Sequence, residues 1–235
     1  MLAPSGRALL DAWEATRSDE AARVTTLLQL ADVGVPRGTE LDVPLGRRNL
    51  VLLGLYERLV GPTVESVLRC PACATLNELS VPIRELRLPA GVQPDGGFDA
   101  WIGEVAIRFR LPTTRDTTEA AAEGSLAAGA LALAERCLVA ADGPLGPEGA
   151  VALASLVSEA DPPAEFAFRL ACVGCGADIA CVLDPVHLVA GHLDRAAHAL
   201  LDDVHVLAGA YHWSEVDILA LSPQRRRAYL DRLDA

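Results

Sequence analysis

Two Cys-x-x-Cys motifs are the residues of this sequence best suited to chemistry. Cys70 and Cys73 form the first motif, and Cys172 and Cys175 form the second. Each motif can place two thiolates on one side of a tight turn, and two such turns supply the four soft ligands of a tetrahedral zinc ion. Four thiolate ligands leave no coordination position for water. The sequence therefore predicts a structural Zn²⁺ site rather than a catalytic one.

We expect this protein to be made in the cytoplasm and to stay there. The segment from Met1 to Arg7 lacks a charged start followed by an apolar core, and no apolar run approaches the roughly 20 residues that span a bilayer. Cytoplasmic thiols stay reduced, so paired cysteines there indicate metal ligands before they indicate disulfides. The alternative interpretation is one redox-active pair, or a set of unrelated buried cysteines.

The surroundings of the two motifs differ in one detail. Gly176 directly follows the second motif, where such turns often need a positive φ. Ala74 occupies the corresponding position after the first motif and departs from that preference. The stretch from Cys73 to Cys172 also exceeds the roughly 15–20 residues between ordinary paired motifs. We therefore expect a subdomain inserted between the two halves of the site.

Other reactive side chains lack the spacing that chemistry requires. The histidines contain no pair at i, i+4 and no HExxH motif, so we expect them on helix faces or partly buried; they are His187, His192, His198, His205 and His212. Cys137 and Cys181 lie among apolar residues, which favours packing in the core. No GxSxG, GxGxxG or phosphate-binding loop is present. The sequence thus predicts no catalytic residue, no enzyme and no small-molecule substrate.

The charge balance bears on possible partners. A net charge of −12 argues against binding to nucleic acid or to an anionic membrane, because both need a basic face. Arg225–Arg227 form a local basic cluster, and the last two predicted helices superficially resemble a helix-turn-helix. The segment from Glu215 to Leu221 is barely two helical turns, however. Zinc ribbons do occur in nucleic-acid-binding proteins, so a zinc-ribbon nucleic-acid-binding regulatory protein remains the alternative function.

Hydrophobic periodicity predicts the helices that must position these residues. Apolar residues recur at helical spacing from Val24 to Ala31, which predicts a helix with one buried face. Residues 47–60 are apolar on most sides and predict a helix central to the core. Further helices are predicted over residues 116–140 and 150–159 and over the last fifty residues.

Period-two patterns predict the strands. Short strands are expected on both sides of each cysteine motif, over residues 64–69, 79–83, 165–170 and 179–183. A further half-buried strand is predicted over residues 101–111, where apolar and polar side chains alternate. Three capping signals mark helix starts: Thr113 with Asp116, Ser214 with Asp217, and Ser222 with Pro223.

We therefore expect an α+β fold, a mostly helical domain built around a small zinc-ribbon-like β subdomain. Apolar residues make up 51% of the chain and charged residues 22%, which is typical of a globular protein. The predicted regions form one compact unit. They are an N-terminal helical region (1–62), a zinc-ribbon β region (63–112 with 164–185), an inserted helical region (113–163) and a C-terminal helical region (186–235).

Several short strings, found from about residue 40 to the C-terminus, carry a family resemblance. They are PLGR at 44–47, LLGLYERL at 52–59, CPAC at 70–73, RLPT at 110–113 with Asp116, CVGCG at 172–176, VHVLA at 204–208, YHWSE at 211–215, DILAL at 217–221 and RRRAYL at 225–230. With these strings the chain resembles baseplate proteins of contractile-tailed phages. It is also similar to related proteins of phage-tail-like contractile injection systems.

The resemblance implies a non-enzymatic protein that helps to form the baseplate or hub of a contractile particle. The implied partners are other baseplate or hub proteins, and neither nucleic acid, membrane nor small molecule is among them. The implied localisation is the cytoplasm, with assembly into a phage-tail-like particle. The family includes both incorporated components and assembly factors, and the resemblance does not choose between them or between phage and injection system.

Overall fold

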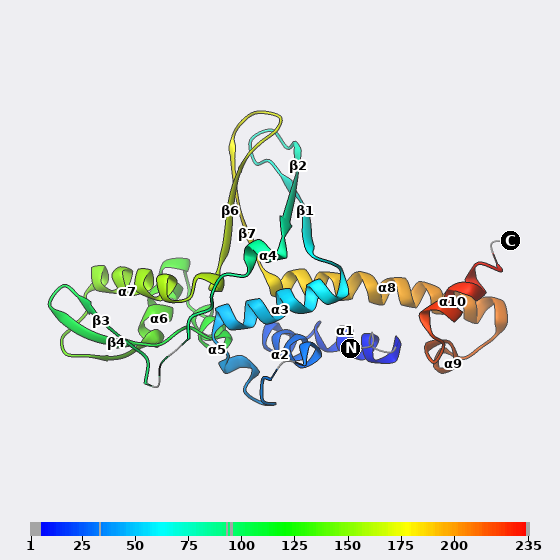
Figure 1. The fold of residues 1–235 in the computed structure, drawn as a ribbon, viewed down its shortest axis with the longest axis horizontal. Helices are drawn as coiled ribbons and strands as arrows, with labels where there is room; N and C mark the ends of the chain where they lie inside the picture. The colour runs from blue at the N-terminus through cyan, green and yellow to red at the C-terminus, as the bar shows by residue number, and fades with distance from the viewer. Residues whose placement is uncertain (1–5, 33, 93, 95, 234–235) are drawn as a thin grey trace.

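The computed structural model describes residues 6–32, 34–92, 94 and 96–233. Residues 1–5, which belong to the segment that gave the expectation of no signal peptide, lie outside this range. The described chain is mostly helical and carries small antiparallel sheets, so the predicted α+β class is confirmed. Figure 1 shows an elongated molecule with one long helix running along its axis.

The body consists of four helices that share the main hydrophobic core. They are α1 (Gly6–Ala15), α2 (Glu20–Ala31), α3 (Leu45–Leu59) and α8 (Pro185–Tyr211), with the short 3₁₀ helix η1 (Glu40–Asp42) beside α2. The predicted apolar face of α2 is confirmed, because Val24, Leu27 and Leu28 are almost fully buried. The helix ends where Asp32 adopts a left-handed conformation with a φ of 49°.

Two β-hairpins project from this body, side by side (Figure 1). The first is β1 (Thr63–Arg69) with β2 (Leu76–Pro82), and the second is β6 (Phe166–Ala171) with β7 (Asp178–Leu183). Both are antiparallel, as the sequence predicts, and each carries one cysteine motif at its tip. The short helices α4 (Ile83–Leu86) and η2 (Pro162–Ala164) lie at the base of the hairpins. Inward side chains such as Leu68 and Leu170 pack between the hairpins.

A second sheet lies at one end of the molecule. It contains β3 (Phe98–Ile102), β4 (Val105–Phe109) and β5 (Leu138–Ala141), and it packs against α6 (Leu126–Cys137) and α7 (Pro147–Ala160). The strand predicted over residues 101–111 is wrong in extent, because the chain reverses at Gly103 with a φ of 61°. Residues 98–109 form a hairpin that packs with the inserted helices rather than beside the cysteines.

The helical region predicted over residues 116–140 is mostly helical, but it ends earlier than predicted. The chain forms α5 (Thr114–Ala120), then α6, then the strand β5. Ser125 starts α6 as an N-cap, its hydroxyl accepting from the Ala128 amide. Leu138 and the residues after it pair with β4. Tertiary pairing thus overrides the helical propensity of this Ala-rich stretch.

The cap predicted at Thr113 is confirmed. The Thr113 hydroxyl accepts from the Asp116 amide, and the Asp116 carboxylate accepts from the Thr113 amide at 2.9 Å. Arg110 adds a two-pronged ion pair with Asp116, at 2.6 and 2.7 Å. These contacts fix the entry into the inserted region.

Buried polar groups connect α3 to the inserted region. The guanidinium of Arg48 donates to the Thr114 hydroxyl, and the Asn49 amide donates to two carbonyls of η2. Asp161 accepts from the Gly46 amide at 2.8 Å and from the Gly91 amide at 3.1 Å. A Cβ at position 46 would lie 2.0 Å from the Asp161 carboxylate, so only glycine fits there.

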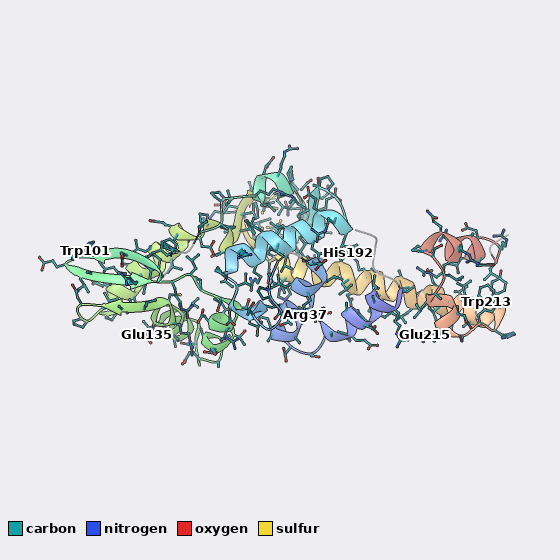
Figure 2. All side chains as sticks on the ribbon, turned by 60° about the horizontal axis from the view of Figure 1, so that its bottom comes forward. Arg37, Trp101, Glu135, His192, Trp213 and Glu215 are labelled. Atoms are coloured by element: carbon teal, nitrogen blue, oxygen red, sulfur yellow. The ribbon has the colours of Figure 1, made fainter. Side chains whose placement is uncertain are left out.

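The opposite end of the molecule is built on the last turns of α8. The helices α9 (Glu215–Leu219) and α10 (Pro223–Leu230) fold back on α8, with Ser214 and Ser222 as N-caps, as predicted. Tyr211 stacks on Trp213, and Tyr229 meets both rings in T-shaped contacts over this separate core. Trp101 and Trp213 lie at opposite ends of the long axis (Figure 2).

Candidate metal centre

The two cysteine turns have the same backbone hydrogen bonds. In the first turn the Cys70 amide donates to the Thr75 carbonyl and the Ala74 amide donates to the Cys70 carbonyl. In the second turn the Cys172 amide donates to the Ala177 carbonyl and the Gly176 amide donates to the Cys172 carbonyl. The four bonds measure 2.8–2.9 Å. Both turns therefore present their two thiols from the same kind of loop.

The difference between Ala74 and Gly176 does not change the backbone. Gly176 has a φ of 72°, and Ala74 adopts a φ of 61° at the corresponding position. Ala74 accepts the left-handed conformation at a steric cost that glycine avoids. Ala74 therefore departs from the glycine preference of this position, but its backbone conformation matches that of Gly176.

The hairpins bring the four sulfur atoms into one cluster. All four lie within 4.8 Å of one another, with Cys70 and Cys172 buried and Cys73 and Cys175 exposed. The Cys70–Cys175 sulfur distance is 3.8 Å and the Cys73–Cys172 distance is 3.6 Å. Zn–S bonds of 2.3 Å in a tetrahedron give an edge of about 3.8 Å. The cluster fits a metal ion bound by four thiolates.

The local electrostatics favour a thiolate at Cys172. Burial raises the pKa of this thiol, but amide hydrogen bonds from Cys175 and Gly174 outweigh burial and lower the pKa to about 6. The Gly174 amide lies 3.3 Å from the sulfur. The pKa of Cys73 is also lowered, chiefly by the Thr75 hydroxyl at 3.2 Å. Several thiolates this close repel one another, and a bound cation would neutralise that repulsion.

The remaining cysteines lie elsewhere. Cys137 is buried at the end of α6, and burial raises the pKa of its thiol to about 11. Burial also raises the pKa of Cys181, which is partly exposed on β7. A raised pKa keeps a thiol protonated and inert at neutral pH. Neither residue joins the cluster. Cys137 is buried as the sequence predicts, whereas Cys181 is only partly buried.

Four of the five histidines lie on α8, and His212 directly follows its last residue. Three of the histidines on α8 contact other side chains. His198 receives Trp13 edge-on, His192 contacts Tyr56 in the same way, and His187 lies beside Asp184. In the part of the chain that the structure describes, no other group of three or more His, Cys, Asp or Glu side chains converges as the four cysteines do. No helix among the described residues is long and apolar enough to cross a membrane.

Sequence reasoning missed two side chains that border the cysteines. Asn77 is 1% exposed on β2, and its carboxamide reaches the second turn. Thr75 lies so close to Gly174 that a Cβ at position 174 would approach the threonine hydroxyl to 2.6 Å. Little signal was available, because the predicted strand begins at residue 79 and leaves Asn77 outside it, whereas β2 begins at Leu76.

Fold and centre together define the class: an α+β protein whose two cysteine-tipped hairpins form one four-thiol centre compatible with a metal ion. Over residues 6–140, more than half of its length, the chain matches the family model described as T4 bacteriophage base plate protein. The chain belongs to that family, which confirms the resemblance noted in the sequence. Comparisons with curated proteins and with solved structures give no match.

Proposed function

We propose that this protein is a structural, non-enzymatic component of the baseplate or hub of a contractile tail, in a phage or in a contractile injection system. The observation that carries the proposal is the family match over residues 6–140. The match includes the first cysteine hairpin and the capped start of the inserted region. The strings near the C-terminus, beyond the match, add the same resemblance independently.

The partners in this proposal are other baseplate or hub proteins. The molecule is elongated, and the hairpins and the two ends of the long axis point in different directions (Figure 1). Such a shape suits a subunit that joins several neighbours. A net charge of −12 keeps the chain apart from nucleic acid and anionic membranes, and it favours neighbours with basic surfaces.

We further propose that the four cysteines hold one structural Zn²⁺ ion. In support, the four sulfur atoms lie within 4.8 Å of one another, which is compatible with a tetrahedral site, and four thiolate ligands leave no position open for catalysis. The ion would be bound by Cys70, Cys73, Cys172 and Cys175. Zinc binding by such sites contributes on the order of 10 kcal/mol, which is comparable with the whole stability of a domain. It would join two hairpins that lie far apart in the sequence.

The test of the function is the protein content of intact particles. We expect mass spectrometry of purified contractile particles to find this chain at a few copies, and a deletion strain to lack complete baseplates. A deletion strain complemented with the wild-type gene is the control. If the chain is absent from mature particles while deletion still blocks assembly, an assembly factor is indicated. Particles that form and fire normally without the chain would contradict both versions.

A further inference from the structure

The two cysteine hairpins are related by an approximate repeat, and at one buried position they differ in polarity. Counting from the first cysteine of each motif, Asn77 in β2 corresponds to Ile179 in β7. Both side chains face inward, and they are 1% and 5% exposed. An apolar residue is the ordinary occupant of such a position. A buried carboxamide there needs partners for its polar atoms.

Asn77 finds these partners in the opposite hairpin as well as in its own. Its Oδ1 accepts from the Val173 amide at 2.9 Å. Its Nδ2 donates to the Thr75 carbonyl at 2.9 Å and lies 3.7 Å from the sulfur of Cys172. One side chain therefore connects the first turn, the backbone of the second turn and one of the four sulfur atoms.

The other half of the repeat explains why Ile179 needs no such contact. Pro71 is the residue that corresponds to Val173, and proline has no amide hydrogen. At the position equivalent to Val173, the first turn thus presents no N–H that a side chain from β7 would have to accept. The second turn does present one, and Asn77 accepts it. Each pair leaves no amide hydrogen without an acceptor at this position. In the pair Val173–Asn77 the carboxamide accepts from the amide, and in the pair Pro71–Ile179 the amide hydrogen is absent.

We propose that Asn77 is a positioning residue of the metal centre, which orients the second cysteine turn so that its sulfur atoms face those of the first. This inference rests on the proposed zinc site. Partners one step beyond the ligands commonly contribute 10–100-fold to metal affinity, because they fix the ligands before the ion arrives. The cross-hairpin contacts of Asn77 give it this role without contact with the metal itself.

The experiment measures zinc affinity by competition with a chromogenic chelator in the whole protein. We expect Asn77→Ile, which copies the residue of the other hairpin, to weaken zinc binding at least tenfold. Val173→Pro alone should also weaken binding, because Asn77 then lacks its donor. The double variant copies the Pro71–Ile179 pair, so its loss should be smaller than the product of the two single losses. Ser80→Ala, on the exposed outer face of β2, is the matched control and should bind as wild type.

Two further readouts separate positioning from general stability. With Co²⁺ in place of zinc, Asn77→Ile should alter the thiolate-to-metal charge-transfer bands, which a merely structural role would leave unchanged. If Asn77→Ile does not fold, the zinc affinity of Asn77→Asp tests the proposal instead. This variant keeps an acceptor for Val173 but turns a negative oxygen towards Cys172, so it too should bind at least tenfold more weakly.

The outcomes distinguish this inference from the site on which it rests. A wild-type protein that binds no zinc overturns the zinc site and this inference together. A wild-type protein that binds zinc, with folded Asn77 variants that bind it equally well, overturns the role of Asn77 alone. If the double variant loses zinc affinity by the full product of the two single losses, the proposed pairing of Asn77 with Val173 is overturned.

Discussion

Cys137 and Cys172 are both buried thiols, yet their pKa values move in opposite directions. Cys137 meets little but burial, which raises its pKa to about 11. Cys172 meets burial too, but amide donors surround its sulfur and lower its pKa to about 6. The pKa direction does not by itself identify a ligand, however. The Ala177 amide lowers the pKa of Cys175, but the neighbouring thiols, chiefly Cys73, raise it to about 12. The convergence of the four sulfur atoms is what separates the candidate ligands from Cys137.

Substitution of these two cysteines should therefore have different results. We expect wild-type protein purified without added metal to contain about one zinc per chain. Cys172→Ser should lose the zinc and unfold at the hairpins, with aggregation of the exposed segments, because it opens a closed site. Cys137→Ala should retain the zinc and cost roughly 1–2 kcal/mol of stability. Elemental analysis with chemical denaturation measures both. Equal behaviour of the two variants would show that the ligands are wrongly assigned.

The four cysteines of the cluster could be predicted from the sequence, but the residues around them could not. The spacing of a Cys-x-x-Cys motif is local, so the four candidate ligands could be named without a structure. Asn77 could not, because its role depends on Val173 from the opposite hairpin. Ala74 suggested a departure in backbone conformation that does not occur. The hydrogen bonds that fix the turn outweigh the glycine preference of this position.

At the scale of elements, the start of α5 combines a cap with an ion pair. Burial raises the pKa of Asp116, but Arg110 and the Thr113 hydroxyl and amide outweigh it, and the net shift is downward. A carboxylate with a lowered pKa contributes stability that is complete above its unfolded pKa of about 3.9. That contribution is lost as the pH falls from there through the folded pKa.

We accordingly expect Asp116→Asn to lower the free energy of unfolding by about 1–2 kcal/mol at pH 7. The difference from wild type should shrink as the pH falls below about 4, because wild-type Asp116 is then protonated as well. Urea denaturation at several pH values measures this. Asp99→Asn, which breaks an exposed pair with Arg108, is the control and should change little. A difference that is constant down to pH 2 would contradict the assignment.

Elements with a strong local pattern were predictable, and those that depend on distant partners were not. The face of α2 and the caps at Thr113, Ser214 and Ser222 follow from short-range spacing, and all are present. The strand β5 lies in an Ala-rich stretch and exists because β4 offers a free edge. The turn at Gly103 interrupts an alternation that continues on both sides, so periodicity alone extended one strand across it.

At the scale of the whole molecule, the cores are separate. The residues between the hairpin tips form one cluster, and the C-terminal helices form another around Leu207 and Ile218. The 27-residue helix α8 connects the body to the C-terminal cluster. Local stability in such an arrangement need not be uniform.

Metal removal should therefore act locally. We expect a chelator to increase amide hydrogen exchange in β1, β2, β6 and β7, because the ion no longer joins the hairpin tips. Ile218 to Leu221 and the region of Tyr229 should keep their protection, since packing on α8 protects them. Hydrogen exchange with mass spectrometry, with and without chelator, resolves the two regions. Exchange at unfolded-chain rates around Ile218 before chelation would contradict the packing described.

The distance along the chain between the two cysteine turns sets an order of events during synthesis. Translation proceeds at about 5–20 residues per second, so the ribosome needs on the order of 5–20 s to pass from the first turn to the second. During that interval the first turn offers only two sulfur atoms. The four-thiol cluster exists only after Cys175 has emerged, by which time every residue of the inserted region has left the ribosome. Completion of the centre therefore comes after synthesis of the inserted region.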